Sequence, residues 1–411
     1  MLFYFKFTMR KNLILIVSIR DERPSGVSRY IDVLYSELVT NAKDNSDFDV
    51  KFLTFYTDSV AFVNRRDVVS EISIPFFQGV NTFKRSLDEV YEYFSNIKIV
   101  LSPYIDNYSR IILHTNEMCF VYLGDLLRKS YNIEVLFQQH VIPWKFSYEY
   151  DEATFNRINE SYIKGEYKDI QTNKLEKDAY NLADKVIVVT KMAQSYVSTV
   201  FGVAQDKIVV IYNGIADIYS RLRKNFSDDL LFVGRMSKEK GFHFLIEALV
   251  YLSKRGIFPR LIAVGEDYIP DWVNRAISEN SLNVDFMGKL GYKELVEVYK
   301  RGPIGIIPSI HEQCSYTAIE MSMFGLPIIN TEVDGLCEIF DNNASLSIPV
   351  EFDRFTGIHV SSKIFADSIL AFLNNRSLKC KHSVLVRQRF LQEFTSFKMI
   401  NKLLNFYTTC L

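Results

Sequence analysis

The chain has 411 residues, of which 48% are hydrophobic and 24% are charged, and its net charge is −1. This length exceeds what one ordinary hydrophobic core organises and predicts two domains, and the balanced charge disfavours nucleic acid as the main partner. The five cysteines show neither metal-ligand nor disulfide spacing, which is typical of a reducing, cytoplasmic compartment.

The two ends of the chain bear on membrane contact. Near the amino end the apolar residues are interrupted by Lys6, Arg10 and Lys11, and no apolar run reaches the ~18–20 residues of a spanning helix. A small-residue cleavage site is lacking as well, so we expect a buried strand here and not a signal peptide. From Arg354 onward basic residues outnumber acidic ones, which suits either a solvated helix face or peripheral contact with an anionic membrane surface.

Apolar runs and helical patterns alternate through the first half of the chain, and this rhythm predicts a parallel, doubly wound sheet. The expected strands are Leu13–Ile19, Phe48–Phe55, Arg110–Leu113, Val135–Phe137, Val186–Thr190 and Lys207–Ile211. The expected helices are Val27–Val39, Asn81–Phe94, Cys119–Ser130 and one that ends at Val200, and Glu149–Lys177 has the spacing of a solvated helical stretch.

Two positions of this first half lie where an α/β fold places ligands, at the carboxyl ends of strands. Gly26 stands in the loop between the first strand and its helix, although this loop is not a G-x-G-x-x-G dinucleotide motif. His140 follows a predicted strand, and His114 stands at the end of another. A lone histidine is most often structural, so both interpretations are kept for each residue.

The second half opens with a strand, a glycine turn at Gly234, and then Arg235 and Lys240 ahead of a helix that extends to about Leu252. Arginine can bind phosphate oxygens in bidentate fashion and lysine adds a mobile point charge. This arrangement therefore predicts a diphosphate site, with an ordinary solvated loop as the alternative.

Residues 306–330 predict a strand–loop–helix–strand unit, with Glu312 in the loop and Glu320 two helical turns further on. An anion can be held by the free backbone N–H groups at the start of the helix, because a helix amino end carries partial positive charge. Those groups belong to Cys314, Ser315 and Tyr316. Two acids that flank an anion site suit a nucleotide sugar better than a metal, since no histidine or third acid stands at ligand spacing. The alternative is a solvated loop acid and a surface helix charge.

Further elements complete a second domain. We expect strands at Arg260–Gly265 and Val284–Gly288, and helices at Tyr292–Tyr299, Lys363–Asn374 and Ser383–Tyr407. The predicted organisation is residues 1–215 as the first domain, 216–228 as a linker, 229–382 as the second domain and 383–411 as a carboxyl-terminal helix. Glu338 is expected to be structural.

Two segments resemble the retaining family-4 glycosyltransferases of the GT-B fold. EQCSYTAIEMSMFGLPII resembles the family's E-x7-E signature, with Glu312 and Glu320 on its two acids, although Gln313, Cys314 and Ser315 replace its usual Gly-Phe-Gly. FVGRMSKEKGFHFLIEAL resembles the family's VGRLxxxKGxxxLIxAL segment, which includes Arg235 and Lys240.

The resemblance implies two Rossmann-like doubly wound domains that face a cleft, with a UDP- or GDP-sugar held mainly by the second domain. It implies donor contacts from Gly26 and from the glycine turn at Gly265, a histidine at His140 close to the reacting sugar, and a last helix that crosses back to the first domain. Together with the residues it implies catalytic roles for Arg235, Lys240, Glu312 and His140, retention of configuration, and neither a metal nor a cofactor.

The acceptor stays open between a glycan, a lipid-linked intermediate and a peptide, and peripheral contact with the inner face of the membrane stays open as well. A phosphorylase or epimerase could use the same scaffold, but no motif indicates the lysine-anchored pyridoxal cofactor of a phosphorylase. A catalytically silent partner subunit that binds a nucleotide sugar is the alternative from another class.

Overall fold

The structure is a computed structural model. It describes residues 11–19, 25–41, 48–55, 61–64, 69–75, 86–142, 171–223, 225–266, 269–341, 343–353 and 357–411. The predictions for the loop at 20–24, for the helix start at 81–85 and for the stretch 149–170 lie outside the described residues.

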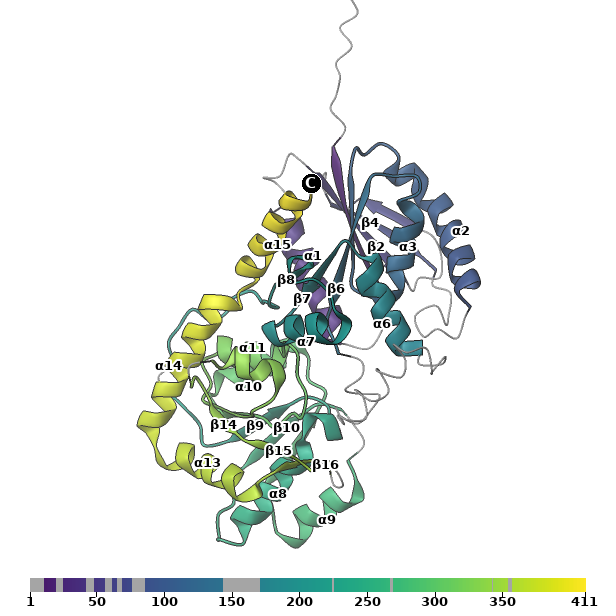
Figure 1. Cartoon of the computed structure of the whole chain (residues 1–411). Coiled ribbons are helices and arrows are strands. Elements are labelled where there is room, and N and C mark those ends of the chain that lie inside the picture. The colour runs from purple at the N-terminus through teal and green to yellow at the C-terminus, as the bar shows by residue number, and fades with distance from the viewer. Residues whose placement is uncertain are drawn as a thin grey trace, which may run out of the picture. The chain divides into compact units, whose positions relative to one another are not determined.

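The chain divides into two compact units (Figure 1). The first comprises residues 1–148, 152–211 and 399–411, and the second comprises residues 149–151 and 212–398. None of the helices among the described residues combines the length and the apolar character needed to span a membrane.

The first unit contains an eight-stranded sheet, counted over the described residues, with the order β3-β4-β2-β1-β5-β6-β7-β8. Every neighbouring pair is parallel except β3 with β4. The strands are β1 (Asn12–Ile19), β2 (Phe48–Phe55), β3 (Ala61–Asn64), β4 (Val69–Ile74), β5 (Ile111–Thr115), β6 (Ile133–Gln139), β7 (Lys185–Val188) and β8 (Ile208–Val210). The helices of this unit are α1 (Gly26–Asn41), α2 (Leu87–Ile105), α3 (Val121–Leu127), α6 (Gln171–Leu182), α7 (Lys191–Phe201) and α15 (Ser396–Cys410), which begins at its boundary.

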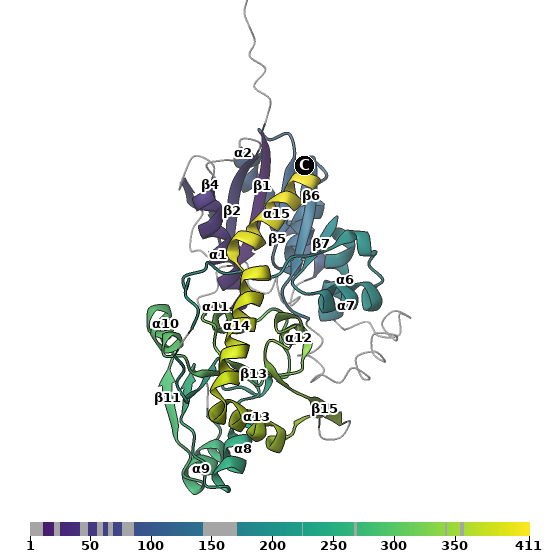
Figure 2. The same cartoon turned by 90° about the vertical axis from the view of Figure 1, so that its left-hand side faces the viewer.

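The central strand β1 is apolar at nearly every position because helices cover both faces of the sheet. Leu13, Leu15 and Val17 belong to one core cluster with buried residues of α2, α3, α6 and α7. The alternate residues Ile14 and Ile16 are equally buried on the opposite face. Figure 2 shows α1 and α15 on the side of the sheet that faces the viewer.

A buried polar network ties α15 to this second face. His114, which pairs in register with Ile16, has its Nδ1 2.5 Å from the hydroxyl of Tyr407 and its Nε2 2.9 Å from Oε1 of Gln138. Tyr30 donates to the same oxygen at 2.7 Å. Since that oxygen accepts, Nε2 of His114 carries its proton and Nδ1 accepts from Tyr407. Burial lowers the pKa of His114 to about 4, so the network is neutral. Since β5 extends to Thr115, His114 lies within this strand and not at its end.

The second unit contains a six-stranded parallel sheet, counted in the same way, with the order β11-β10-β9-β12-β13-β14. Its strands are β9 (Leu230–Val233), β10 (Leu261–Val264), β11 (Val284–Gly288), β12 (Ile304–Ile307), β13 (Ile328–Thr331) and β14 (Leu346–Ile348), and β15 (Val350–Asp353) forms an antiparallel hairpin with β16 (Gly357–Val360). Its helices are α8 (Phe242–Ser253), α9 (Asp271–Glu279), α10 (Tyr292–Lys300), α11 (Tyr316–Met323), α12 (Asp334–Ile339), α13 (Ser362–Asn374) and α14 (Arg376–Glu393). The α/β class and the two doubly wound parallel sheets confirm the prediction.

The prediction of one helix over Ser383–Tyr407 is wrong, because the chain breaks at Phe394–Thr395 between α14 and α15. Ile215 donates its backbone N–H to the carbonyl of Phe394 at 3.0 Å and accepts from the N–H of Ser396 at 2.8 Å. A Cβ at Gly214 would lie 2.5 Å from the carbonyl oxygen of Thr395. The break follows from this close backbone pairing of distant segments.

A buried carboxyl group in the first unit makes its stability depend on pH. Glu176 on α6 accepts from Tyr180 at 2.7 Å and from Gln139 at 3.2 Å. Burial raises the pKa of Glu176 to about 8, so the folded protein retains this proton at a pH where the unfolded chain has released it. Unfolding therefore becomes easier as pH rises from about 4.5 to about 8, and the loss is complete above about 8.

We predict that Glu176→Gln removes this dependence. The free energy of unfolding of the wild type should fall relative to the variant by about 1.4 kcal/mol per pH unit within that window. Urea unfolding between pH 5 and 8.5 measures the difference, and Glu92→Gln, an exposed acid on α2 of the same unit, is the matched control. Parallel pH profiles for wild type and Glu176→Gln would contradict the prediction.

Candidate active site

The candidate site of the second unit lies at the carboxyl ends of two neighbouring parallel strands. β9 and β12 pair through Leu230 with Ile304 and Phe232 with Ile306. In the sheet order the chain leaves β9 toward β10 on one side and later returns to β12 on the other. Such a switch point is where open α/β sheets bind ligands. The loop after β9 carries Arg235 and Lys240, and the loop after β12 carries Glu312.

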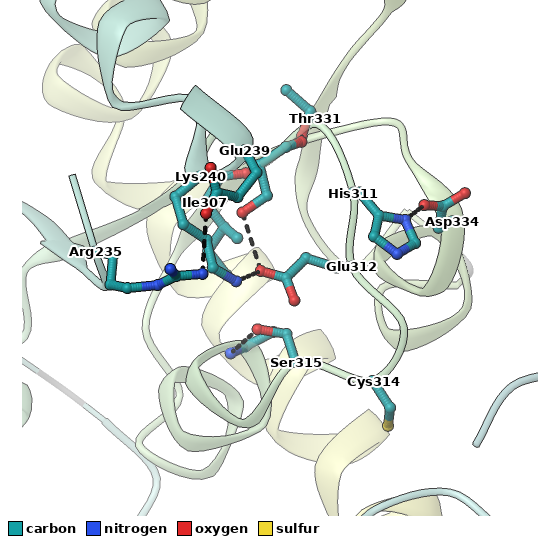
Figure 3. Close-up of polar contacts among 12 residues, drawn as sticks. Arg235, Glu239, Lys240, Ile307, His311, Glu312, Cys314, Ser315, Thr331 and Asp334 are labelled. Carbon is teal, nitrogen blue, oxygen red and sulfur yellow. Dashed lines mark hydrogen bonds and ion pairs between the residues drawn. The ribbon is translucent and has the colours of Figure 1, made fainter. Parts of the chain in front are cut away.

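An ion pair joins these two loops (Figure 3). Nζ of Lys240 lies 2.5 Å from Oε1 of Glu312, and the Ser309 hydroxyl donates to the same oxygen at 3.0 Å. The side chains of Lys240 and Glu312 are 29% and 11% exposed. Glu312 is therefore not a solvated loop acid, because its carboxylate is mostly buried and its charge is matched by the predicted phosphate-binding lysine.

The two loops also meet backbone to backbone. The N–H of Ile310 donates to the carbonyl of Glu239 at 3.0 Å. Gly241, which follows Lys240, has a φ of +65°, and a Cβ there would lie 1.8 Å from the carbonyl oxygen of Pro308. Only glycine permits both this backbone conformation and this approach. The glycine fixes where Lys240 stands relative to Glu312.

The turns after β9 and β10 approach each other in a similar way. Gly234 has a φ of +152° and Gly265 a φ of +141°. A Cβ on Gly265 would lie 2.0 Å from the carbonyl oxygen of Gly234. These two predicted donor-site glycines therefore shape the sheet edge through their backbones, next to Arg235.

Arg235 is the accessible cation of the cluster in Figure 3. Its side chain is 64% exposed, and Nη2 lies 2.9 Å from Oε1 of Glu239. An ion pair this exposed contributes little stability, so the guanidinium can exchange Glu239 for an anionic ligand at small cost. Figure 3 shows Arg235, Lys240, Glu312 and Ser315 gathered together.

The start of α11 supplies the third part of the site. Ser315 caps the helix by accepting the N–H of Ala318 at 3.4 Å. Cys314 is buried, its carbonyl accepts from Nδ2 of Asn213 at 3.1 Å, and its side chain points away from the cluster in Figure 3. Burial raises the pKa of the Cys314 thiol to about 12, which excludes it as a thiolate nucleophile at neutral pH. Tyr316, half-buried, is the first residue of α11.

α14 fixes the other end of α11. The buried Arg387 donates to the carbonyl of Met323 at 2.8 Å, and Ser383 donates to the carbonyl of Gly325 at 2.7 Å. The second guanidinium nitrogen of Arg387, Nη2, lies 2.6 Å from Oδ2 of Asp217. A cation at a helix carboxyl end stabilises it. Sequence reasoning missed this support, because nothing local marks Arg387 as buried.

Glu320 lies in the body of α11 and is only 7% exposed, so it is not a surface charge. The hydroxyl of Tyr299 on α10 donates to Oε2 of Glu320 at 3.1 Å, and the Tyr299 ring stacks on Phe324 with centroids 5.1 Å apart. Sequence reasoning placed Tyr299 at the end of a helix but assigned it no contact with an acid.

A second brace holds the loop that carries Glu312. His311 contacts Asp334 through Nδ1, and Asp334 has a left-handed φ of +37°. The next residue, Gly335, donates its N–H to the carbonyl of Glu312 at 2.9 Å. A Cβ at Gly335 would lie 1.4 Å from the carbonyl oxygen of Gln313. Sequence reasoning gave neither Asp334 nor Gly335 a role.

Glu338 of α12, expected to be structural, accepts from the hydroxyl of Tyr212 at 2.9 Å, and its backbone carbonyl accepts from Arg389 at 2.9 Å. No group of three or more His, Cys, Asp or Glu side chains that could hold a metal ion occurs in the part of the chain that the structure describes.

The first unit holds the other two predicted site residues. Nε2 of His140 lies 2.9 Å from Oδ1 of Asn116, and its ring packs on that of Tyr30 with centroids 4.8 Å apart. Burial, with a smaller contribution from His114, lowers the pKa of His140 to about 3. Gly26 is the first residue of α1, and a Cβ there would contact no atom of the described residues within 4 Å.

Two doubly wound units, the second with cationic and acidic loops at a strand switch point, define the GT-B class of glycosyltransferases. Residues 24–217 match the family described as Glycosyltransferase Family 4, and residues 227–375 match Glycosyl transferases group 1. The chain belongs to this family of glycosyltransferases, which confirms the resemblance noted in the sequence.

Individual relatives are distant. An uncharacterized glycosyltransferase of Methanocaldococcus jannaschii is 29% identical over 178 residues, 39% of this chain and 45% of the relative. The chain spans less than half the length of the first curated relatives it matches. Among solved structures, sucrose-phosphate synthase from Thermosynechococcus elongatus has a TM-score of 0.68 at 19% identity, over 98% of this chain and 99% of its own. HepE of Anabaena, in complex with UDP and glucose, has a TM-score of 0.66 at 15% identity, over 97% and 99%.

We predict that Gly241→Ala destabilises the second unit by roughly 3–5 kcal/mol, because the methyl group would force the loops after β9 and β12 apart. Gly256 is the matched control: its φ is +75°, but a Cβ there would meet no atom within 4 Å in the part of the chain that the structure describes. Gly256→Ala should cost only the about 1–2 kcal/mol of the left-handed conformation. Urea unfolding of the two variants measures the difference, and equal losses would show that the contact with Pro308 is not tight.

Proposed function

We propose that this protein transfers a sugar from a UDP- or GDP-sugar to an acceptor hydroxyl, with retention of configuration and without a metal ion. The observation that carries the proposal is the cluster at the carboxyl ends of β9 and β12. There the accessible Arg235 and the Glu312-paired Lys240 lie beside the amino end of α11. This is a site for a diphosphate.

The chemistry requires the nucleoside diphosphate to leave the anomeric carbon, so negative charge develops on the leaving group. Pre-arranged positive groups at that point lower the barrier most. Arg235 would bind the phosphate oxygens, and Lys240 would bind them as well, since its ammonium group has three donors and Glu312 takes one of them. Backbone N–H groups near Ser315 would complete the anion site. The two cations and the helix amino end supply the charge that a divalent metal supplies in other transferases.

The two acids would hold the groups on either side of the diphosphate. Glu320, fixed on one oxygen by Tyr299, would accept from the ribose hydroxyls, and Glu312 would accept from hydroxyls of the sugar. Glu312 is already ion-paired, and the Cys314 thiol is protonated through burial. We therefore propose attack of the acceptor on the same face as the departing diphosphate, without a covalent sugar–enzyme intermediate.

The similarity to HepE, solved with UDP and glucose, supports a nucleotide sugar as the donor. We propose that the acceptor belongs to cell-surface glycan or glycoconjugate synthesis and is a glycan, a lipid-linked intermediate or a peptide, used in the cytoplasm or at the inner face of the membrane. We propose that the protein needs no cofactor. A silent nucleotide-sugar-binding subunit is the alternative function.

Release of the nucleoside diphosphate from a panel of UDP-, GDP- and ADP-sugars tests the proposal. We expect slow release from one UDP- or GDP-sugar, and Arg235→Ala or Lys240→Ala should lower turnover by roughly 10²–10³. Arg255→Ala is the matched control, because Arg255 is also in an exposed ion pair of the second unit, with Asp367 at 3.3 Å. Binding of a nucleotide sugar without any release would favour the silent subunit, and wild-type rates in both site variants would refute the site.

The ribose contact gives a separate prediction. Glu320→Ala should raise KM for the donor with a smaller effect on kcat, because the ribose is bound equally in the ground state and the transition state. Tyr299→Phe removes only the hydroxyl that fixes Glu320 and should raise the same KM by a smaller factor. Steady-state kinetics with the donor varied measure both. A loss confined to kcat would place Glu320 at the reacting centre instead.

A further inference from the structure

Asn116, immediately after β5, is the only hydrogen-bond partner of the His140 ring nitrogens among the described residues, and sequence reasoning gave it no role. It is 5% exposed. Its side-chain Nδ2 and its backbone N–H both donate to the carbonyl of Val17 on β1, each at 3.3 Å. The amide nitrogen is thus committed to the sheet, and the amide oxygen faces Nε2 of His140 at 2.9 Å.

This arrangement decides the protonation of the His140 ring. An amide oxygen only accepts, so Nε2 of His140 must carry the proton and Nδ1 must keep its lone pair. The orientation of Asn116 is itself fixed by Val17, because a rotated amide would turn its NH₂ toward the imidazole and lose the bond to that carbonyl. Two strands, β1 and β5, therefore select one tautomer at the end of a third, β6.

We propose that Asn116 is a positioning residue that holds His140 as the Nε2–H tautomer, with Nδ1 as the acceptor for a hydroxyl group of the transferred sugar. This inference rests on the proposed function for its substrate, whereas the tautomer follows from the first unit alone. A neutral imidazole nitrogen accepts from O–H, and the opposite tautomer would present N–H at the same place and lose that hydrogen bond.

The surroundings keep the ring neutral. Among the residues that the structure describes, the titratable groups that face His140 are Tyr30 from α1 and His114 from β5, and His114 is in turn bonded to Tyr407 from α15. The pKa of His140 is lowered to about 3 by burial and by His114. The acceptor lone pair is accordingly retained throughout the neutral pH range.

The first experiment reads the tautomer directly, without substrate. Long-range ¹H–¹⁵N correlation spectra of protein labelled with ¹⁵N-histidine distinguish Nε2–H from Nδ1–H rings. We expect His140 as Nε2–H in the wild type and in Asn116→Asp, which keeps the acceptor, and a mixture of tautomers in Asn116→Leu. His114 is an internal control, because its tautomer is set by Gln138 and Tyr407 and should be Nε2–H in all three proteins. His140 as Nδ1–H in the wild type, or unchanged in Asn116→Leu, overturns the inference.

The second experiment measures donor kinetics on the same proteins. Loss of one positioned hydrogen bond should lower kcat/KM by about tenfold in Asn116→Leu, and Asn132→Leu, an exposed asparagine of the same unit, should have no effect. In Asn116→Asp the new carboxylate should raise the pKa of His140. Activity should then approach the wild type at high pH and fall as pH drops through that raised pKa, since the imidazolium has no lone pair.

The two readouts separate the two claims. A tautomer change in Asn116→Leu with unchanged kinetics overturns the role of Asn116 in sugar binding and leaves the transferase intact. The tautomers could behave as expected while the protein releases no nucleoside diphosphate from any sugar nucleotide. That result overturns the proposed function, and with it the claim that Nδ1 of His140 accepts from a sugar hydroxyl. Unfolding midpoints of the variants identify a loss of activity that comes from misfolding alone.

Discussion

The ion pair between Lys240 and Glu312 is the interaction on which the second unit's site depends. A carboxylate that is 11% exposed is unfavourable unless a cation and hydrogen bonds compensate it, and Lys240 and Ser309 do so. Because the partners come from loops after different strands, the pair holds those loops at one separation. The close approach of Gly241 to Pro308 allows that separation. The same contact thus positions both groups of the proposed donor site, the carboxylate of Glu312 and the ammonium group of Lys240.

The two glutamates of the signature have the same chemistry but different surroundings. Glu312 has its charge matched by Lys240, whereas Glu320 accepts a hydrogen bond from the neutral hydroxyl of Tyr299. Glu320 is therefore the acid better suited to accept from further neutral hydroxyls, as the proposed ribose contact requires. Sequence spacing alone treats the acids as equivalent, and the tertiary partners distinguish them.

Apolar strands that alternate with helical patterns could be predicted from the sequence even where they are short, as β8 is with three residues, and elements outside that alternation could not. Phe48–Phe55 and Val284–Gly288 match β2 and β11, because several residues in sequence carry the signal. The strands β3 and β14–β16, with three or four residues each, were missed. Of these, β3, β15 and β16 belong to antiparallel pairs outside the strand–helix alternation. The break between α14 and α15 was missed because its cause, the backbone of Ile215, lies far away in the chain.

The candidate site shows the same limit. Arg235, Lys240, Glu312 and Ser315 could be predicted because each stands at a fixed offset from a strand or a helix start. Tyr299, Asn116 and Arg387 could not, because each acts through a partner that only the fold brings near. For Tyr407 and His114 the contact spans 293 residues, and a polar residue inside a strand indicates nothing about a distant hydroxyl.

The two units differ in whether their candidate site residues keep formal charge. In the second unit the strand ends carry formal charges, with Arg235 and Lys240 positive. In the first unit the buried titratable groups are neutral: the pKa values of His114 and His140 are lowered to about 4 and about 3, and that of Glu176 on α6 is raised to about 8, in each case chiefly by burial. All three side chains are therefore uncharged at neutral pH. A nucleotide sugar has an anionic diphosphate and an uncharged, hydroxyl-rich sugar, and its transition state adds negative charge to the diphosphate. Ion pairing that retains positive charge in the second unit suits the diphosphate, and burial that removes charge from the imidazole of His140 in the first unit suits a hydroxyl group.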